Sequence, residues 1–187
     1  GGDWYSDQSS IPNLLEFIDD NTDVPIDLIE KNSKIGEDIF ISSPYLYLTG
    51  HGNIKFSDEE AIILRNHLLS GAFLHADDNY GMDKSFRREM KKVFPDKDWV
   101  ELPFDHKIFN CYYDFPKGLP KIHQHDNQSP QALGLFEKDR LIVLYTFESD
   151  LGDGWENELV HNNPEEIRAK ALKMGTNIVI YNLMGYE

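Results

Sequence analysis

The chain has 187 residues, and 18 lysines and arginines against 33 aspartates and glutamates give it a formal net charge of −15 at pH 7. This acidity argues against nucleic acid and against an anionic membrane surface as partners, because both would bring like charges together. The hydrophobic fraction of 40% argues against a disordered chain, and the length fits one domain over residues 1–187. No apolar run approaches the roughly 20 residues of a membrane helix, so we expect no membrane insertion.

The predicted elements alternate between helices and strands. In chain order they are a helix at 11–18, a strand at 45–49, a helix at 57–70, a strand at 72–75, a helix at 85–93, a strand at 141–146 and a helix whose first residue is Pro164. Ser57 and Glu60 form a capping box at the start of the second helix. An apolar stripe follows it, made of Ile62, Ile63, Leu64, Leu68 and Leu69. Residues 176–183 fit either a strand or a helix, and we favour the helix.

The predicted strands are continuously apolar rather than alternating, which is typical of strands covered on both faces. Strands that alternate with helices indicate a mostly parallel sheet flanked by helices. We expect the strands at 45–49 and 72–75 to be parallel neighbours at the centre of this sheet. Ligands of such sheets bind outside the carboxyl ends of the strands, so the residues that follow each strand are the first candidates for a site.

Gly50, His51 and Gly52 directly follow the first predicted strand. Glycines adopt positive φ readily, and successive backbone amides in such a turn can bind an anion. The alternative is a tight turn that carries a surface histidine. His51 is therefore both a candidate ligand-binding residue and a candidate catalytic residue.

His75, Asp77 and Asp78 end the next predicted strand. Two adjacent carboxylates repel each other unless a cation, a shared proton or hydrogen bonds separate their roles. Asp77 and Asp78 are therefore candidates for a metal ligand, a general base or a nucleophile. The alternative is that Asp78 caps the next segment and Asp77 is merely solvated.

Further along the chain, Asp105 and His106 are a third pair of candidates, and His106 is also a candidate metal ligand. His123 and His125 form a His-x-His pair that is compatible with a divalent metal, but the spacing is not diagnostic, and we favour ordinary loop histidines. Trp155, in an acidic segment at 149–156, fits either stacking on a sugar ring or packing over a turn, and packing is the commoner role.

Cys111 is the one cysteine in the sequence, which excludes an intrachain disulfide and a multi-cysteine zinc site. It lies within an aromatic run at 109–113. This setting favours a buried thiol over a nucleophile.

Six motifs occur in one order along almost the whole chain, at residues 2–5 (Gly-Asp-Trp-Tyr), 47–52, 71–78, 88–95, 105–109 and 149–155. Together they resemble the bacterial family called domain of unknown function 4159. That family is similar in outline to class I glutamine amidotransferase-like proteins, including the trehalose-utilisation type. The resemblance implies a three-layer, flavodoxin-like α/β domain with a mostly parallel sheet, and it implies no assigned reaction.

Departures from the amidotransferase pattern limit what the resemblance implies. Asp77 stands where amidotransferases carry their nucleophilic cysteine, so we do not expect glutamine hydrolysis by that mechanism. Trehalose-utilisation-type proteins tend to have a histidine at that position and a His-Pro pair downstream, where this chain has His106 and Lys107. Relatives begin with a strand before the Gly-Asp-Trp-Tyr segment, which implies a first strand before residue 1. They often carry export signals, which implies a periplasmic or secreted location and leaves a cytoplasmic one open.

Three hypotheses for function follow. The first is a domain that binds a small polar ligand, a carbohydrate by resemblance, in a pocket made of His51, His75, Asp77, Asp78, Asp105 and His106. The second is a metal-assisted hydrolase that uses the same groups, with Asp77 or Asp78 holding a divalent cation and a histidine as base. The third is an interaction module of a multi-protein assembly.

Overall fold

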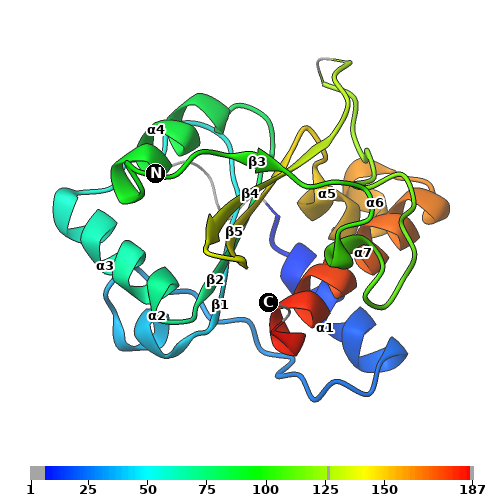
Figure 1. Cartoon of the computed structure of the whole chain (residues 1–187). Coiled ribbons are helices and arrows are strands. Elements are labelled where there is room, and N and C mark those ends of the chain that lie inside the picture. Colours follow the sequence, from blue (N-terminus) through cyan, green and yellow to red (C-terminus); the bar gives the residue numbers. More distant parts are fainter. Residues whose placement is uncertain (1–6, 126, 186–187) are drawn as a thin grey trace.

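The structure is a computed structural model, and it describes residues 7–125 and 127–185 (Figure 1). Its elements are α1 (Ser10–Asn21), α2 (Asp38–Ser42), β1 (Tyr45–Leu48), α3 (Asp58–Leu69), β2 (Phe73–Asp77), α4 (Asp83–Val93), β3 (Val100–Glu101), the short 3-10 helix η1 (Lys107–Phe109), β4 (Gln131–Glu137), β5 (Arg140–Phe147), α5 (Leu151–Trp155), α6 (Glu158–His161) and α7 (Glu165–Met184). None of these helices is both long and apolar enough to span a bilayer. The Gly-Asp-Trp-Tyr segment at 2–5 lies outside the described residues.

The strands form one open sheet in the order β1-β2-β5-β4-β3. β2 pairs in parallel with both β1 and β5, whereas β4 pairs antiparallel with β5 and with β3. Among the described strands β4 therefore runs opposite to the other four, and the sheet is mostly parallel as predicted. The predicted pairing of β1 with β2 is confirmed. Their predicted position at the centre is wrong: β5 is the central strand of the described sheet, β2 lies beside it, and β1 lies at the edge.

Helices cover both faces of this sheet (Figure 1). α2, α3 and α4 lie on one face, where Leu64, Leu68 and Phe86 pack against the strands. α1, α5, α6 and α7 lie on the other side, where Ile18 and Trp155 belong to a second buried apolar cluster. The predicted three layers are confirmed.

The helix signals in the sequence place most boundaries correctly. The Ser57 hydroxyl accepts a hydrogen bond from the Glu60 amide at 3.0 Å, and the Glu60 carboxylate accepts one from the Ser57 amide at 2.6 Å, so the capping box is formed. The predicted stripe is wrong at Ile62 and at Leu69, which are 59% and 40% exposed, because the buried face of α3 runs through Ala61, Leu64 and Leu68.

The last helix continues through residues 176–183, as favoured from the sequence. Its first helical residue is Glu165. Pro164, predicted to be the first residue of the helix, is instead the N-cap residue that precedes it. Asn177 lies buried within this helix, where its side-chain amide donates to the carbonyl oxygens of Ile108 and Tyr113 at 2.9 and 2.8 Å. These contacts tie α7 to the segment that follows β3.

Candidate metal centre

Three chain segments meet at the carboxyl ends of β2 and β5. Asp77 at the end of β2 lies opposite Thr146 of β5, and the Asp78 amide donates to the Thr146 carbonyl at 3.3 Å. The loop at 117–130 runs along the end of β5, because the Ile122 amide donates to the Ser149 carbonyl at 2.9 Å. α5 begins at Leu151, shortly after β5 ends at Phe147, and Asp153 of α5 lies 2.9 Å from His123 of this loop.

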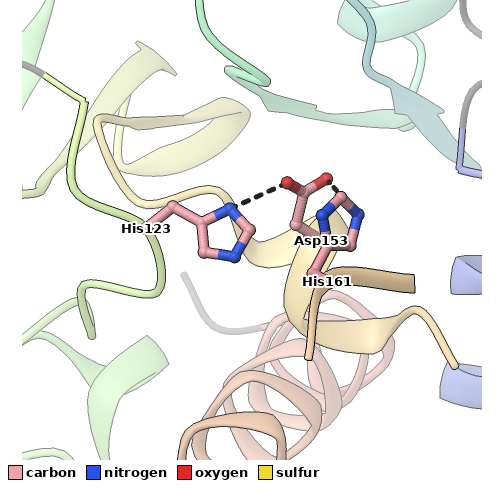
Figure 2. A group of neighbouring side chains, drawn as sticks. All are labelled: His123, Asp153 and His161. Carbon is pink, nitrogen blue, oxygen red and sulfur yellow. Dashed lines mark ion pairs between the residues drawn. The ribbon is translucent and has the colours of Figure 1, made fainter. Parts of the chain in front are cut away.

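Three histidines and two aspartates form a continuous array at this place, which we call the His–Asp cluster. It consists of His123 and His125 from the loop, Asp150 and Asp153 from the start of α5, and His161 from α6. The successive contacts are His125 Nε2 to Asp150 Oδ2 at 2.6 Å, Asp150 Oδ2 to His123 Nδ1 at 3.2 Å, His123 Nδ1 to Asp153 Oδ2 at 2.9 Å, and Asp153 Oδ1 to His161 Nε2 at 3.4 Å. Figure 2 shows Asp153 between His123 and His161.

Two overlapping groups in the cluster have the geometry of metal ligands. His123, His125 and Asp150 form one group, and His123, Asp153 and His161 form the other. Within each group, one ligand atom from every residue lies within 4.8 Å of the others. His123 belongs to both groups.

Asp150 differs from an ordinary surface aspartate in its burial, its hydrogen bonding and its backbone conformation. Its side chain is 1% exposed, and its Oδ1 atom has no hydrogen-bond partner. Its φ of +68° lies in the left-handed region, as does the φ of +59° at Glu148. Non-glycine residues in this region cost free energy and cluster at functional sites. A buried carboxylate oxygen without a partner calls for an explanation, and a cation or a ligand bound at this position would supply one.

Carboxyl groups outnumber cations at this edge of the sheet. Buried ones include Asp77, Asp78, Glu148, Asp150 and Asp153. Among ion pairs between described residues, Lys121, 2.8 Å from Glu148, is the one lysine or arginine that reaches any of the five. Hydrogen bonds to Asp150 and Asp153 raise the pKa of His123 to about 10, so a proton on His123 compensates part of the charge.

His75 and Asp77 lie directly behind the cluster in a buried hydrogen-bond chain. The Tyr45 hydroxyl lies 3.2 Å from His75 Nδ1, and His75 Nε2 lies 3.0 Å from the Thr146 hydroxyl, which in turn donates to Asp77. The Gly152 amide donates to the other oxygen of Asp77 at 2.7 Å. Burial lowers the pKa of His75 to about 3, so this imidazole is neutral. These hydrogen bonds anchor the start of α5 to the end of β2, and they thereby position Asp150 and Asp153.

The loop of Gly50, His51 and Gly52 follows β1 as predicted, and both glycines have positive φ, +129° and +92°. His51 is exposed. The Gly52 carbonyl accepts a hydrogen bond from Ser85 of α4 at 3.1 Å, so this loop is docked on the helix layer opposite to α5.

Asp105 and His106 line a surface cavity of 410 Å³ together with Phe136, Lys138 and Tyr181. Phe136, near the end of β4, and Lys138, in the turn between β4 and β5, lie at the end of the hairpin where β5 begins. Thr146 lies near the opposite, carboxyl end of β5. Asp105 and His106 are therefore separated from Asp77 by most of the length of β5. The structure does not gather the six predicted pocket residues in one place.

The sequence did not single out Asp150, Asp153 or His161 as site residues. The His-x-His spacing at 123–125 was the one available signal, and Asp126 next to it lies outside the described residues. Trp155 packs rather than stacking on a ligand: it is fully buried, and its indole N–H donates to the Ala171 carbonyl at 2.8 Å.

Fold and cluster together define a mixed α/β protein with a histidine–aspartate cluster at the carboxyl edge of its sheet. Over residues 1–183 the sequence matches the family described as domain of unknown function (DUF4159), and the chain belongs to this family. A search of curated proteins found no match.

Proposed function

We propose that this domain binds a divalent transition-metal ion at the His–Asp cluster. The observation that carries the proposal is convergence: three histidines and two buried aspartates arrive from a loop, from α5 and from α6. They form two overlapping groups of three that share His123, and within each group the candidate ligand atoms lie within 4.8 Å of one another. Such convergence of three segments on one point is unlike the exposed acidic clusters that are common on acidic proteins.

The donor set indicates the class of ion. Imidazole nitrogens suit zinc, copper, iron and nickel, whereas magnesium and calcium prefer carboxylate, carbonyl and water oxygens. Two imidazoles and a carboxylate resemble the three protein ligands of a catalytic zinc site, which keeps one coordination position open. The proposed ion therefore has room for water or for a small polar ligand.

The test is calorimetric titration of chelator-treated protein with Zn²⁺, with Mg²⁺ as the hard-cation comparison. We expect Zn²⁺ to bind more tightly than Mg²⁺, and we expect His123→Ala and Asp150→Asn each to weaken Zn²⁺ binding at least tenfold. His51→Gln is the matched control, because it removes an exposed histidine of the loop after β1, outside the His–Asp cluster, and should leave the Zn²⁺ affinity unchanged. Unaltered Zn²⁺ affinity in both cluster variants would overturn the proposal.

Metal-assisted hydrolysis is a second candidate function, and the environment of the Asp78 carboxyl group supports it. The side chain of Asp78 is buried, and its Oδ1 atom has no hydrogen-bond partner. Burial, with a further contribution from the nearby Asp83, raises the pKa of Asp78 to about 6. A carboxylate of this kind can accept a proton from a water molecule that an ion polarises.

The test of hydrolysis uses p-nitrophenyl acetate as the probe. Zn²⁺-loaded protein should hydrolyse the ester faster than chelator-treated protein, and Asp78→Asn should lose this increase while it keeps its Zn²⁺ affinity. Equal rates with and without Zn²⁺ would remove this candidate and leave the binding proposal in place.

We also propose that the domain has a flavodoxin-like architecture related to that of class I glutamine amidotransferases, and that a small polar ligand approaches from the carboxyl edge of the sheet. Three neighbouring parallel strands between two helix layers support this relation. Thiol chemistry is not part of the proposal. Asp77 occupies the position of the amidotransferase cysteine, and burial raises the pKa of Cys111 to about 11.

A further inference from the structure

We infer that Asn163 fixes the orientation and tautomer of His123, so that Nδ1 is the metal-binding atom and the His–Asp cluster holds one ion, between Asp150 and Asp153. This inference rests on the proposed function, and it adds the ligand atom, the number of ions and a positioning residue.

The orientation of the Asn163 amide follows from its two partners. Its Nδ2 donates to the Asp153 carbonyl at 3.2 Å, and a carbonyl oxygen only accepts hydrogen bonds. The other end of the amide, Oδ1, therefore faces His123 Nε2 at 2.9 Å. Asn163 is 9% exposed, so little water competes for these bonds.

The tautomer of His123 follows from that orientation. An amide oxygen accepts only, so His123 Nε2 carries a hydrogen, and Nδ1 is the atom left for a metal. Nδ1 faces Asp153 Oδ2 at 2.9 Å and Asp150 Oδ2 at 3.2 Å. Metal-bound histidines usually donate their other ring N–H to a carbonyl, a carboxylate or water, which holds the ring in place. Asn163 supplies the equivalent acceptor.

The spacing of these three atoms suits a single ion. Zinc–nitrogen and zinc–oxygen bonds of about 2.0–2.2 Å in a tetrahedral site place neighbouring ligand atoms about 3.3–3.6 Å apart. The observed separations of His123 Nδ1 from the two carboxylate oxygens, 2.9 and 3.2 Å, would have to widen by about 0.1–0.7 Å to reach this range. An ion here takes the place of the Nδ1 proton, and it also brings charge compensation to the unpartnered Asp150 Oδ1.

The same argument sets the number of ions. The two candidate ligand groups share His123, and its Nδ1 has one lone pair to give. Its Nε2 is engaged with Asn163, so it cannot serve a second ion. His125, 2.6 Å from Asp150, and His161, 3.4 Å from Asp153, are therefore available to add an imidazole to this one ion, and they do not complete two separate sites.

The experiment is ¹⁵N NMR of histidine-labelled protein titrated with Zn²⁺, which reports which ring nitrogen binds the metal. We expect one equivalent of Zn²⁺ to bind, with His123 coordinated through Nδ1 and protonated at Nε2. Coordination through Nε2, or two equivalents bound at the cluster, would overturn the inference and leave the proposed function intact. No Zn²⁺ binding at all would overturn both.

Variants of Asn163 test its positioning role. Asn163→Leu removes the acceptor and should weaken Zn²⁺ binding by about 10- to 100-fold, the usual effect of losing such a partner. Asn163→Asp keeps an acceptor for Nε2–H but loses the bond to the Asp153 carbonyl. It should keep the Nδ1 signature and bind Zn²⁺ more tightly than Asn163→Leu does, which separates this role from loss of folding. Gln124→Leu, the same kind of change at an exposed amide of the same loop, is the control. Unchanged Zn²⁺ affinity in Asn163→Leu would contradict the positioning role.

Discussion

Helix α5 packs against α7 beneath the candidate site, and Gly154→Ala tests this contact. A methyl group at position 154 would lie 2.4 Å from Ala171 Cβ on α7 and 3.1 Å from Ile122 Cγ2 in the loop. Carbon atoms pack at about 3.5–4.0 Å. Ala171 Cβ is fixed to its backbone, so α5 would have to move away from α7 by about 1 Å.

Two effects of opposite sign decide the result. Alanine favours a helix over glycine by at most about 1 kcal/mol, and α5 has five residues, so the gain is smaller here. Overpacking a core typically costs about 1–3 kcal/mol. We therefore expect Gly154→Ala to lower the free energy of unfolding by about 1–2 kcal/mol.

Urea denaturation of a double-mutant cycle measures this effect. Ala171→Gly removes the methyl group that Gly154→Ala would strike, so the double variant should be more stable than the sum of the two single changes predicts, by about 1 kcal/mol or more. Because Ile122 precedes His123, Gly154→Ala should also weaken Zn²⁺ binding. Additive effects in the cycle, or a Gly154→Ala protein as stable as the wild type, would refute the packing argument.

Three further predictions concern titrating groups. Burial alone would raise the pKa of Glu89, but hydrogen bonds from the Phe56 amide, Arg88 and Lys92 outweigh it and lower the pKa to about 2, against 4.5 for an ordinary glutamate. Glu89→Gln should therefore lower the unfolding free energy by about 1–3 kcal/mol at pH 7, and the difference in urea should shrink as the pH falls from about 5 towards 2; a constant difference would contradict this. Burial lowers the pKa of His75 to about 3. The unfolded state therefore takes up a proton below about pH 6.5 that the folded state does not, and the wild type should lose stability as the pH falls below that value. Thermal melts of His75→Phe should show a smaller loss of stability over the same pH range. Cys111, with its pKa raised to about 11 from 9.0, should react with iodoacetamide about 100-fold more slowly than a free thiol at pH 8, because the thiolate is the nucleophile; a rate equal to that of glutathione would show an accessible thiolate.

Elements with strong local signals were predictable from the sequence. The capping box before α3 and the continuous apolar runs of β1, β2 and β5 depend on neighbouring residues, and each formed where it was expected. β3 and β4 were missed. β3 has two residues, both exposed, so it carries no apolar pattern. The β4–β5 turn contains Lys138 at a φ of +54°, where glycine or asparagine would have signalled a hairpin.

The candidate site was less predictable because its residues meet through tertiary contacts. Asp150 and His125 are 25 positions apart and touch only because the loop at 117–130 follows the end of β5. The opposite error concerns His106, which was predicted to share a pocket with Asp77. The chain instead continues past β3 towards α7, where the His106 ring lies 5.3 Å from that of Tyr181. Strand ends indicate an edge of the sheet, but the path of the following loop decides which side chains reach it.

The most direct measurement of the central claim is anomalous X-ray diffraction from crystals soaked in Zn²⁺, with data collected on both sides of the zinc absorption edge. Our account predicts one strong anomalous peak at the His–Asp cluster, about 2 Å from His123 Nδ1 and in contact with Asp150 and Asp153. A zinc peak beside His51 or His106 with none at the cluster, or no peak at any of these residues, would contradict it.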